Sequence, residues 1–147
     1  MRTHLVRTAV VALAAAATVV VAGTPSSAAT EVPWSASHGT ASASGTRWTE
    51  RPAGSTSTVL VVKGELRNTG SGCYAVWSQF TFDFMPRPAR KHASLCGPGA
   101  VPVEFSTAYS ALTTGSVFIC KGDTLQDCGE RRTLTSWPVQ AAATAVN

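Results

Sequence analysis

The chain has little charge, few histidines and no stretch with the pattern of an amphipathic helix. Charged residues make up 14% of the 147 residues, and there are three histidines. Beyond residue 29, no run of ten or more residues carries apolar side chains at helical spacing, which excludes a mainly helical domain. The sequence also lacks a C-x-x-C pair and a G-x-S-x-G segment. These absences argue against a cysteine-based zinc site and against the nucleophile turn of α/β-hydrolases.

Residues 1–29 have the three parts of a secretory signal peptide in the right order. Two arginines are followed by an uncharged apolar run at 9–22 and by small, turn-forming residues at 23–29. The apolar run has 14 residues, fewer than the roughly 20 that a transmembrane helix needs, which argues against a membrane anchor. We therefore expect a secreted, extracellular protein that is cleaved after Ala29 and has no membrane contact after cleavage.

Residues 30–147 have the size of one domain with a single hydrophobic core. Cleavage leaves 118 residues, which are too few for two domains. This part carries ten basic and eight acidic residues, so its net charge is +2. The basic residues at 87–91 and the pair at 131–132 are too sparse for a nucleic-acid surface. We expect a monomer without cofactor or nucleic-acid partner, with an ordered core at about 34–139.

Four cysteines, all in the mature part, indicate two disulfides. An even number of cysteines in an exported chain is typical of a disulfide framework. Three pairings are possible, and we favour Cys73–Cys96 with Cys120–Cys128 because each bond then closes a local unit between neighbouring strands. A metal site is disfavoured, because neither the cysteines nor the histidines have ligand spacing.

Short runs of β-branched and aromatic residues, separated by Gly, Pro, Asn and Ser, indicate an all-β domain. The expected strands cover 34–48, 58–66, 73–84, 100–105, 116–121 and 131–137. We expect a small antiparallel β-sandwich, Ig-like or jelly-roll-like, with an open barrel as the alternative. The turn-rich segment between the second and third runs predicts a hairpin, the first run is expected at a sheet edge, and the prolines after the third begin a loop.

Alternation along two of these strands predicts the core. The residues expected to be buried together are Leu60, Val62, Leu66, Tyr74, Val76, Phe80 and Phe82, with Phe84 on the same face of the strand. The residues expected to face outward are Lys63, Glu65, Gln79, Thr81 and Asp83.

No constellation of catalytic residues stands out. Ser71 lies between two glycines in a turn, and His38 and His92 are interpreted as surface residues. The carboxylates have no spacing that selects an acid and base pair. The acidic segment 123–130 offers oxygen ligands for calcium but lacks the alternating pattern of a calcium loop. We expect no enzyme, and a small hydrolase is the least supported function.

Tryptophans and one closed loop supply the candidate ligand contacts. Trp77 falls on the face opposite the buried row and, with Trp48, offers a ring for stacking on a sugar or a partner. This pattern predicts a non-catalytic binding or accessory domain for a wall polymer, a polysaccharide or a protein. The alternative is a protease inhibitor that presents the Cys120–Cys128 loop with Lys121 or Leu125 as the contact, since a rigid loop loses little entropy on binding.

Two motifs resemble those of a group of exported proteins. They are G-E-L-R-N-T-G-S-G-C-Y at 64–74 and the C-K-G and D-C-G triplets at 120–129. Within roughly 48–137 the chain resembles small secreted, disulfide-bonded proteins of actinobacteria that have no established function. The resemblance implies the sandwich and the sequential disulfide pairing, and it carries over no catalytic residue. The secreted subtilisin inhibitors share size and disulfide number but not the residue pattern.

The secreted form is expected to begin at or within a few residues of Thr30, because Ser27 and Ala29 supply the small side chains that a signal peptidase needs. N-terminal sequencing of the protein recovered from culture medium measures this directly. A secreted form that retains Met1 or the intact apolar segment would contradict the prediction.

Overall fold

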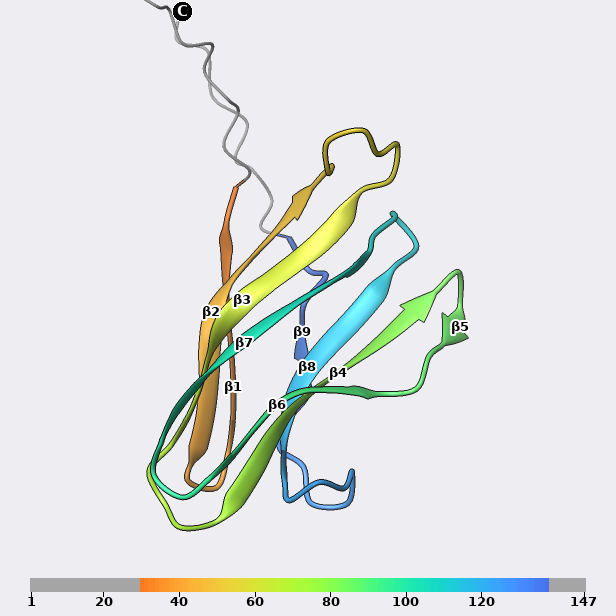
Figure 1. Cartoon of the computed structure of the whole chain (residues 1–147). Coiled ribbons are helices and arrows are strands. Elements are labelled where there is room, and N and C mark those ends of the chain that lie inside the picture. The colour runs from red at the N-terminus through yellow and green to blue at the C-terminus, as the bar shows by residue number, and fades with distance from the viewer. Residues whose placement is uncertain (1–29, 138–147) are drawn as a thin grey trace, which may run out of the picture.

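The computed structural model describes residues 30–137, which form two antiparallel β-sheets that pack face to face (Figure 1). The strands are β1 Val32–His38, β2 Ala41–Glu50, β3 Val59–Asn68, β4 Cys73–Phe82, β5 Met85–Pro86, β6 Arg90–Cys96, β7 Gly99–Ala108, β8 Thr114–Lys121 and β9 Arg132–Thr133. Sheet A has the order β1-β2-β3-β7, and sheet B has the order β5-β4-β8-β9 with β6 also paired to β4. The expected all-β sandwich is confirmed. The expected signal peptide, 1–29, and residues 138–139 of the expected core lie outside the described residues.

The core lies between the sheets and agrees with the predicted inward row. The buried members of that row are Leu60, Val62, Leu66, Tyr74, Val76 and Phe80. Phe82 is only partly buried at the rim of the core. The prediction for Phe84 was wrong, because β4 ends at Phe82 and the chain then turns, which leaves Phe84 in solvent.

The outer face of sheet B is less exposed than alternation predicted. Lys63 and Glu65 of sheet A are exposed as expected, whereas Gln79 and Thr81 are half-buried. Arg131 explains part of this difference, because its guanidinium lies 4.2 Å from the centre of the Phe118 ring and donates to Gln79 Oε1 at 2.5 Å. The segment that precedes β9 therefore covers part of an outer face.

The predicted hairpin between the second and third strands was wrong. β3 pairs with β2 and β7 in sheet A, whereas β4 pairs with β5, β6 and β8 in sheet B. The glycine-rich segment 69–72 is therefore a crossover between sheets. Turn-forming residues favour a reversal of the chain both in a hairpin and in a crossover, so their presence alone does not distinguish a hairpin from a crossover.

Three further strand predictions need correction. The segment 34–48 contains two strands, with β1 at the edge, because Gly39 adopts a φ of +56° and reverses the chain. The expected loop after Pro88 contains β6, whose pairing with β4 supplies the order that its sequence does not indicate. In the segment 131–137 only Arg132–Thr133 forms a strand.

Both predicted disulfides are present. Cys73–Cys96 joins directly opposed residues of β4 and β6, and Cys120–Cys128 closes the loop that follows β8. The described residues contain no free cysteine. The sequential pairing is confirmed.

The buried side chain of Asn68 joins three chain segments at the end of the sandwich where β3 crosses to β4. Its amide nitrogen donates to the carbonyls of Gly70, Gly72 and Gly97 at 3.0, 2.8 and 3.0 Å. Its carbonyl oxygen accepts from the Thr40 hydroxyl at 2.7 Å and from the Gly70 amide at 3.1 Å. One residue therefore holds the β1–β2 turn together with the β3–β4 and β6–β7 connections, each of which crosses between the sheets.

Asn68→Ala is expected to reduce the free energy of unfolding by about 2–4 kcal/mol, because it leaves several partly buried carbonyls without a fixed donor. Asn68→Asp should be at least as damaging, since a carboxylate accepts but cannot donate to those carbonyls. Denaturant titration measures both, with the exposed neighbour Arg67→Ala as a control that should change stability by less than about 0.5 kcal/mol. A smaller loss of stability in Asn68→Asp than in Asn68→Ala would contradict the donor role assigned to Asn68.

Candidate functional site

A cleft of about 470 Å³ opens between β4, the β5–β6 connection with β6, and β7. Figure 1 shows that β6 and β7 are joined at the crossover end and diverge toward the other end. Because β7 pairs with β3 and β6 pairs with β4, the two strands belong to opposite sheets. The cleft therefore lies at one open edge of the sandwich.

Aromatic rings line the interior of the cleft. Phe105 of β7 stacks on His92 of β6, with ring centres 3.7 Å apart and ring planes at 14°. Phe80 meets Phe105 edge to face at 6.5 Å and stacks with Phe82 at 6.1 Å. Alternation places Phe80 and Phe82 on the inner face of β4, and partial exposure of Phe82, His92 and Phe105 leaves apolar surface accessible to a ligand.

Ser78 and His92 form a hydrogen-bonded pair within this cleft. Ser78 Oγ lies 2.7 Å from His92 Nε2, and the serine residue is 2% exposed. Burial, and to a smaller extent the positive charge of Arg90, lowers the pKa of His92 to about 4. The ring is therefore neutral at pH 7 and can exchange a hydrogen bond with the hydroxyl in either direction.

An irregularity in the pairing of β6 turns His92 inward. Val76 of β4 is opposite Ala93, whereas the next residue, Trp77, is opposite Lys91, so His92 has no partner across the ladder. This bulge places His92 on the same side as Ala93, while Lys91 faces outward and reaches Asp123 at 3.0 Å. Without the extra residue, regular alternation would place His92 on the outer face.

Two arginines border the cleft. Arg87 and Arg90 both line it and are largely exposed. Within residues 30–137, no ion pair engages either guanidinium. The backbone of Arg87 is fixed, because its amide donates to the Phe80 carbonyl at 2.8 Å and its carbonyl accepts from Gln79 at 3.2 Å. The cleft thus combines an aromatic interior with positive charge at its edge.

The geometry allows the pair of Ser78 and His92 to position a ligand. A serine hydroxyl 2.7 Å from an imidazole nitrogen is also the arrangement that a nucleophile forms with its general base. In the described part of the chain, however, no carboxylate hydrogen-bonds to the other nitrogen of His92. The nearly complete burial of Ser78 also leaves little access for a reacting carbonyl.

The ligand contacts predicted from the sequence do not form one site. Trp48 lies on the outer face of sheet A, where Lys63 approaches its ring to 6.0 Å, and its indole donates to Glu50 at 2.8 Å. Trp77 lies half-buried on the outer face of sheet B, opposite Phe118 of β8. Two different sheets carry these tryptophans, so they do not combine into a stacking surface.

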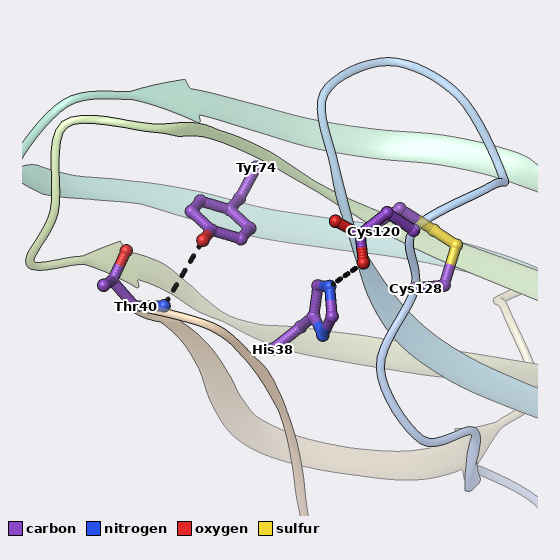
Figure 2. A network of polar contacts seen from close by, with 6 residues as sticks. His38, Thr40, Tyr74, Cys120 and Cys128 are labelled. Carbon is purple, nitrogen blue, oxygen red and sulfur yellow. Dashed lines mark hydrogen bonds and ion pairs between the residues drawn. A yellow bond between two sulfur atoms is a disulfide. The ribbon is translucent and has the colours of Figure 1, made fainter.

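Lys121 and Leu125 are exposed near the Cys120–Cys128 disulfide, at the end of the sandwich away from the β4–β5 turn. Figure 2 shows His38 turned toward this loop, where its Nε2 lies 2.8 Å from an oxygen of Asp127. The Asp127 carbonyl also accepts from the Lys121 amide at 2.7 Å. A disulfide and contacts on both sides therefore fix the base of the loop.

Each carboxylate near this loop has a different side-chain partner. Asp123 pairs with Lys91, Asp127 with His38, and Glu130 with Arg132 at 3.1 Å. Among residues 30–137, no three His, Cys, Asp or Glu side chains gather closely enough to hold a metal ion. The arrangement does not support the calcium interpretation of segment 123–130.

Sequence reasoning missed the cleft because it assigned both histidines to the surface. His38 and His92 are instead half-buried and hydrogen-bonded. One signal was available: Ser78 is the polar residue within the inward row that contains Val76 and Phe80. Nothing in the local sequence indicated which residue would face it.

No family model, no curated protein and no solved structure matches the chain. Within residues 30–137, no helix has the length and apolar character needed to cross a membrane. The protein is thus a small disulfide-bonded β-sandwich with a cleft that has an aromatic interior and arginines at its edge.

Stability is expected to fall as the pH drops from about 6.5 to about 4, because unfolding returns His92 to its ordinary pKa near 6.5 and the unfolded chain then binds a proton that the folded chain does not. His92→Gln should reduce this fall. Urea titrations of both proteins at about pH 7 and pH 4.5 measure it. An equal loss of stability in the variant would show that His92 does not carry this part of the pH dependence.

Proposed function

We propose that this protein is a secreted, non-catalytic binding domain that holds a small amphiphilic anion in the cleft between β4, β6 and β7. The ligand would combine an aromatic or acyl body with a carboxylate, phosphate or sulfate group. This proposal keeps the binding role expected from the sequence but moves the site from the outer tryptophans to the cleft.

The observation that carries the proposal is the combination, around one cavity, of stacked rings and of two arginines that form no ion pair within residues 30–137. Phe105 and His92 offer a flat apolar surface, and Arg87 and Arg90 stand at its edge. Apolar burial supplies affinity in such a cleft, while an arginine fixes the orientation of an anion through charge-assisted hydrogen bonds. Ser78 and His92 add neutral polar contacts inside.

Export and the absence of catalysis belong to the same proposal. The expected leader and two disulfides support an extracellular location, where disulfides persist. The burial of Ser78 and the lack of a carboxylate partner for His92 in the described chain support a role in ligand positioning. The resemblance to small exported proteins of actinobacteria accords with this class but names no ligand.

Naphthalene-2-sulfonate is expected to bind in the cleft more tightly than the neutral naphthalene-2-sulfonamide. Phe105→Ala should weaken binding of both compounds by roughly tenfold, equal to about 1.4 kcal/mol, because it removes the stacking surface. Arg90→Gln should weaken only the sulfonate, by a similar factor, because it removes a charge-assisted contact. Calorimetric titration measures these affinities.

The matched control for Arg90 is Arg51→Gln, which changes an exposed arginine in the β2–β3 connection and should leave both affinities unchanged. Amide chemical shifts of β4, β6 and β7 should report the bound sulfonate. If Phe105→Ala bound the sulfonate as tightly as the unaltered chain does, the cleft would be refuted as the binding site. Chemical-shift changes confined to another surface would refute it as well.

The Cys120–Cys128 loop supports a second candidate function, protease inhibition. Leu125 is 50% exposed, and the base of the loop is fixed by the disulfide and by the contact between His38 and Asp127. A fixed, exposed loop loses little entropy when a protease binds it. Inhibition assays on subtilisin-like and trypsin-like proteases, with Leu125→Ala and Lys121→Ala as variants, separate this function from binding in the cleft.

A further inference from the structure

Exposed apolar side chains gather at one end of the sandwich. Phe84 in the β4–β5 turn is 82% exposed, Met85 at the start of β5 is 66% exposed, and Leu112 in the β7–β8 connection is 53% exposed. Figure 1 shows that these two connections lie at the same end, away from the crossover between β3 and β4. Asp83 and Ser110 line one shared surface depression, so the two connections are neighbours. We call Phe84, Met85 and Leu112 the apolar tip.

The β4–β5 turn has a backbone that does not suit its residues. Phe82 and Met85 are paired, and the two residues between them have positive φ values, +47° at Asp83 and +66° at Phe84. Two-residue hairpin turns of this kind favour Asn-Gly, because an aromatic residue is disfavoured at positive φ. A large ring held there in solvent makes no contribution to the core, so fold stability does not explain it.

Three arginines lie close to the apolar tip in the chain or at the same end of the sandwich. Arg87 and Arg90 follow the turn closely in the chain, and Arg51 begins the β2–β3 connection at the same end. In the described residues, no ion pair engages any of the three. Asp83 is the acidic residue of the turn itself. This end of the sandwich thus carries both exposed apolar side chains and exposed arginines.

We infer that the apolar tip docks on an anionic lipid bilayer, with Phe84, Met85 and Leu112 in the interfacial region and the arginines against lipid phosphates. The tip protrudes, so a protein partner would need a matching pocket, whereas a fluid bilayer accepts protruding side chains without one. Aromatic and apolar side chains enter the headgroup boundary, and nearby arginines add electrostatic attraction to anionic lipids.

This inference goes beyond the proposed function: Arg87 and Arg90 also line the cleft, but Phe84, Met85 and Leu112 lie outside the cleft lining. It also departs from the expectation, drawn from the sequence, of no membrane contact after cleavage. That expectation rested on the absence of a spanning segment, whereas a protruding tip binds at the membrane surface.

Vesicle sedimentation tests the inference with the secreted chain. Vesicles of phosphatidylcholine with about one quarter phosphatidylglycerol should bind the protein at least tenfold more tightly than vesicles of phosphatidylcholine alone, since two or more arginines contribute. Added salt should weaken this binding. Equal binding to both vesicles, or no binding to either, would overturn the inference.

The variant Phe84→Gly separates docking from a structural role. It should reduce binding to the anionic vesicles roughly tenfold or more and raise the melting temperature by about 4 °C, because glycine relieves the positive φ. Naphthalene-2-sulfonate binding should stay unchanged, so the failure of docking and the failure of the cleft are distinguishable. Unchanged vesicle binding, or a lower melting temperature, would contradict the role assigned to Phe84.

Two further variants complete the test. Phe84→Asn also tolerates positive φ and should lose vesicle binding while the protein stays folded. Leu125→Ala removes an exposed apolar side chain at the opposite end and should bind vesicles as the unaltered chain does. Equal losses in Leu125→Ala and Phe84→Asn would show that binding is not specific to the tip, and would overturn the inference.

Discussion

Asn68 satisfies hydrogen-bonding groups from three chain segments at the end of the sandwich where β3 crosses to β4 and β6 crosses to β7. Its partners belong to the β1–β2 turn at Thr40, to the β3–β4 crossover at Gly70 and Gly72, and to the β6–β7 crossover at Gly97. Buried groups of this kind are costly to leave without partners, so these connections hold one another in place. The junction lies directly before β4 and β7, the strands that enter sheet B and sheet A after these two crossovers.

The two ends of the molecule differ in construction as a consequence. The crossover end has Asn68, the Cys73–Cys96 disulfide and the tethered Cys120–Cys128 loop. From that fixed end β6 and β7 diverge, which leaves the aromatic cleft and the exposed turn at Phe84 toward the other end. Binding surfaces on a rigid scaffold keep their geometry without a ligand, so both proposed contacts start from preformed positions.

The sequence predicted much of the fold and little of the candidate site. Alternation along β3 and β4 placed Leu60, Val76 and Phe80 correctly, because the strand period alone decides which side chains share a face. The site depended on His92, which was assigned to a surface loop. The inward position of His92 follows from a bulge in the pairing of β6 with β4, and no local sequence pattern indicates such a bulge.

The sequence by itself determined the all-β class and most of the inward faces, because strand period is a local property of the chain, and it favoured the sequential disulfide pairing among three possible ones. Tertiary structure alone decided that β3 and β4 lie in different sheets and that His92 meets Ser78. It also decided that Phe84 leaves the inward row for solvent, since β4 ends at Phe82 where β5 pairs with it. Each of these outcomes depends on which strands meet, and partner choice is set by the whole core and its connections.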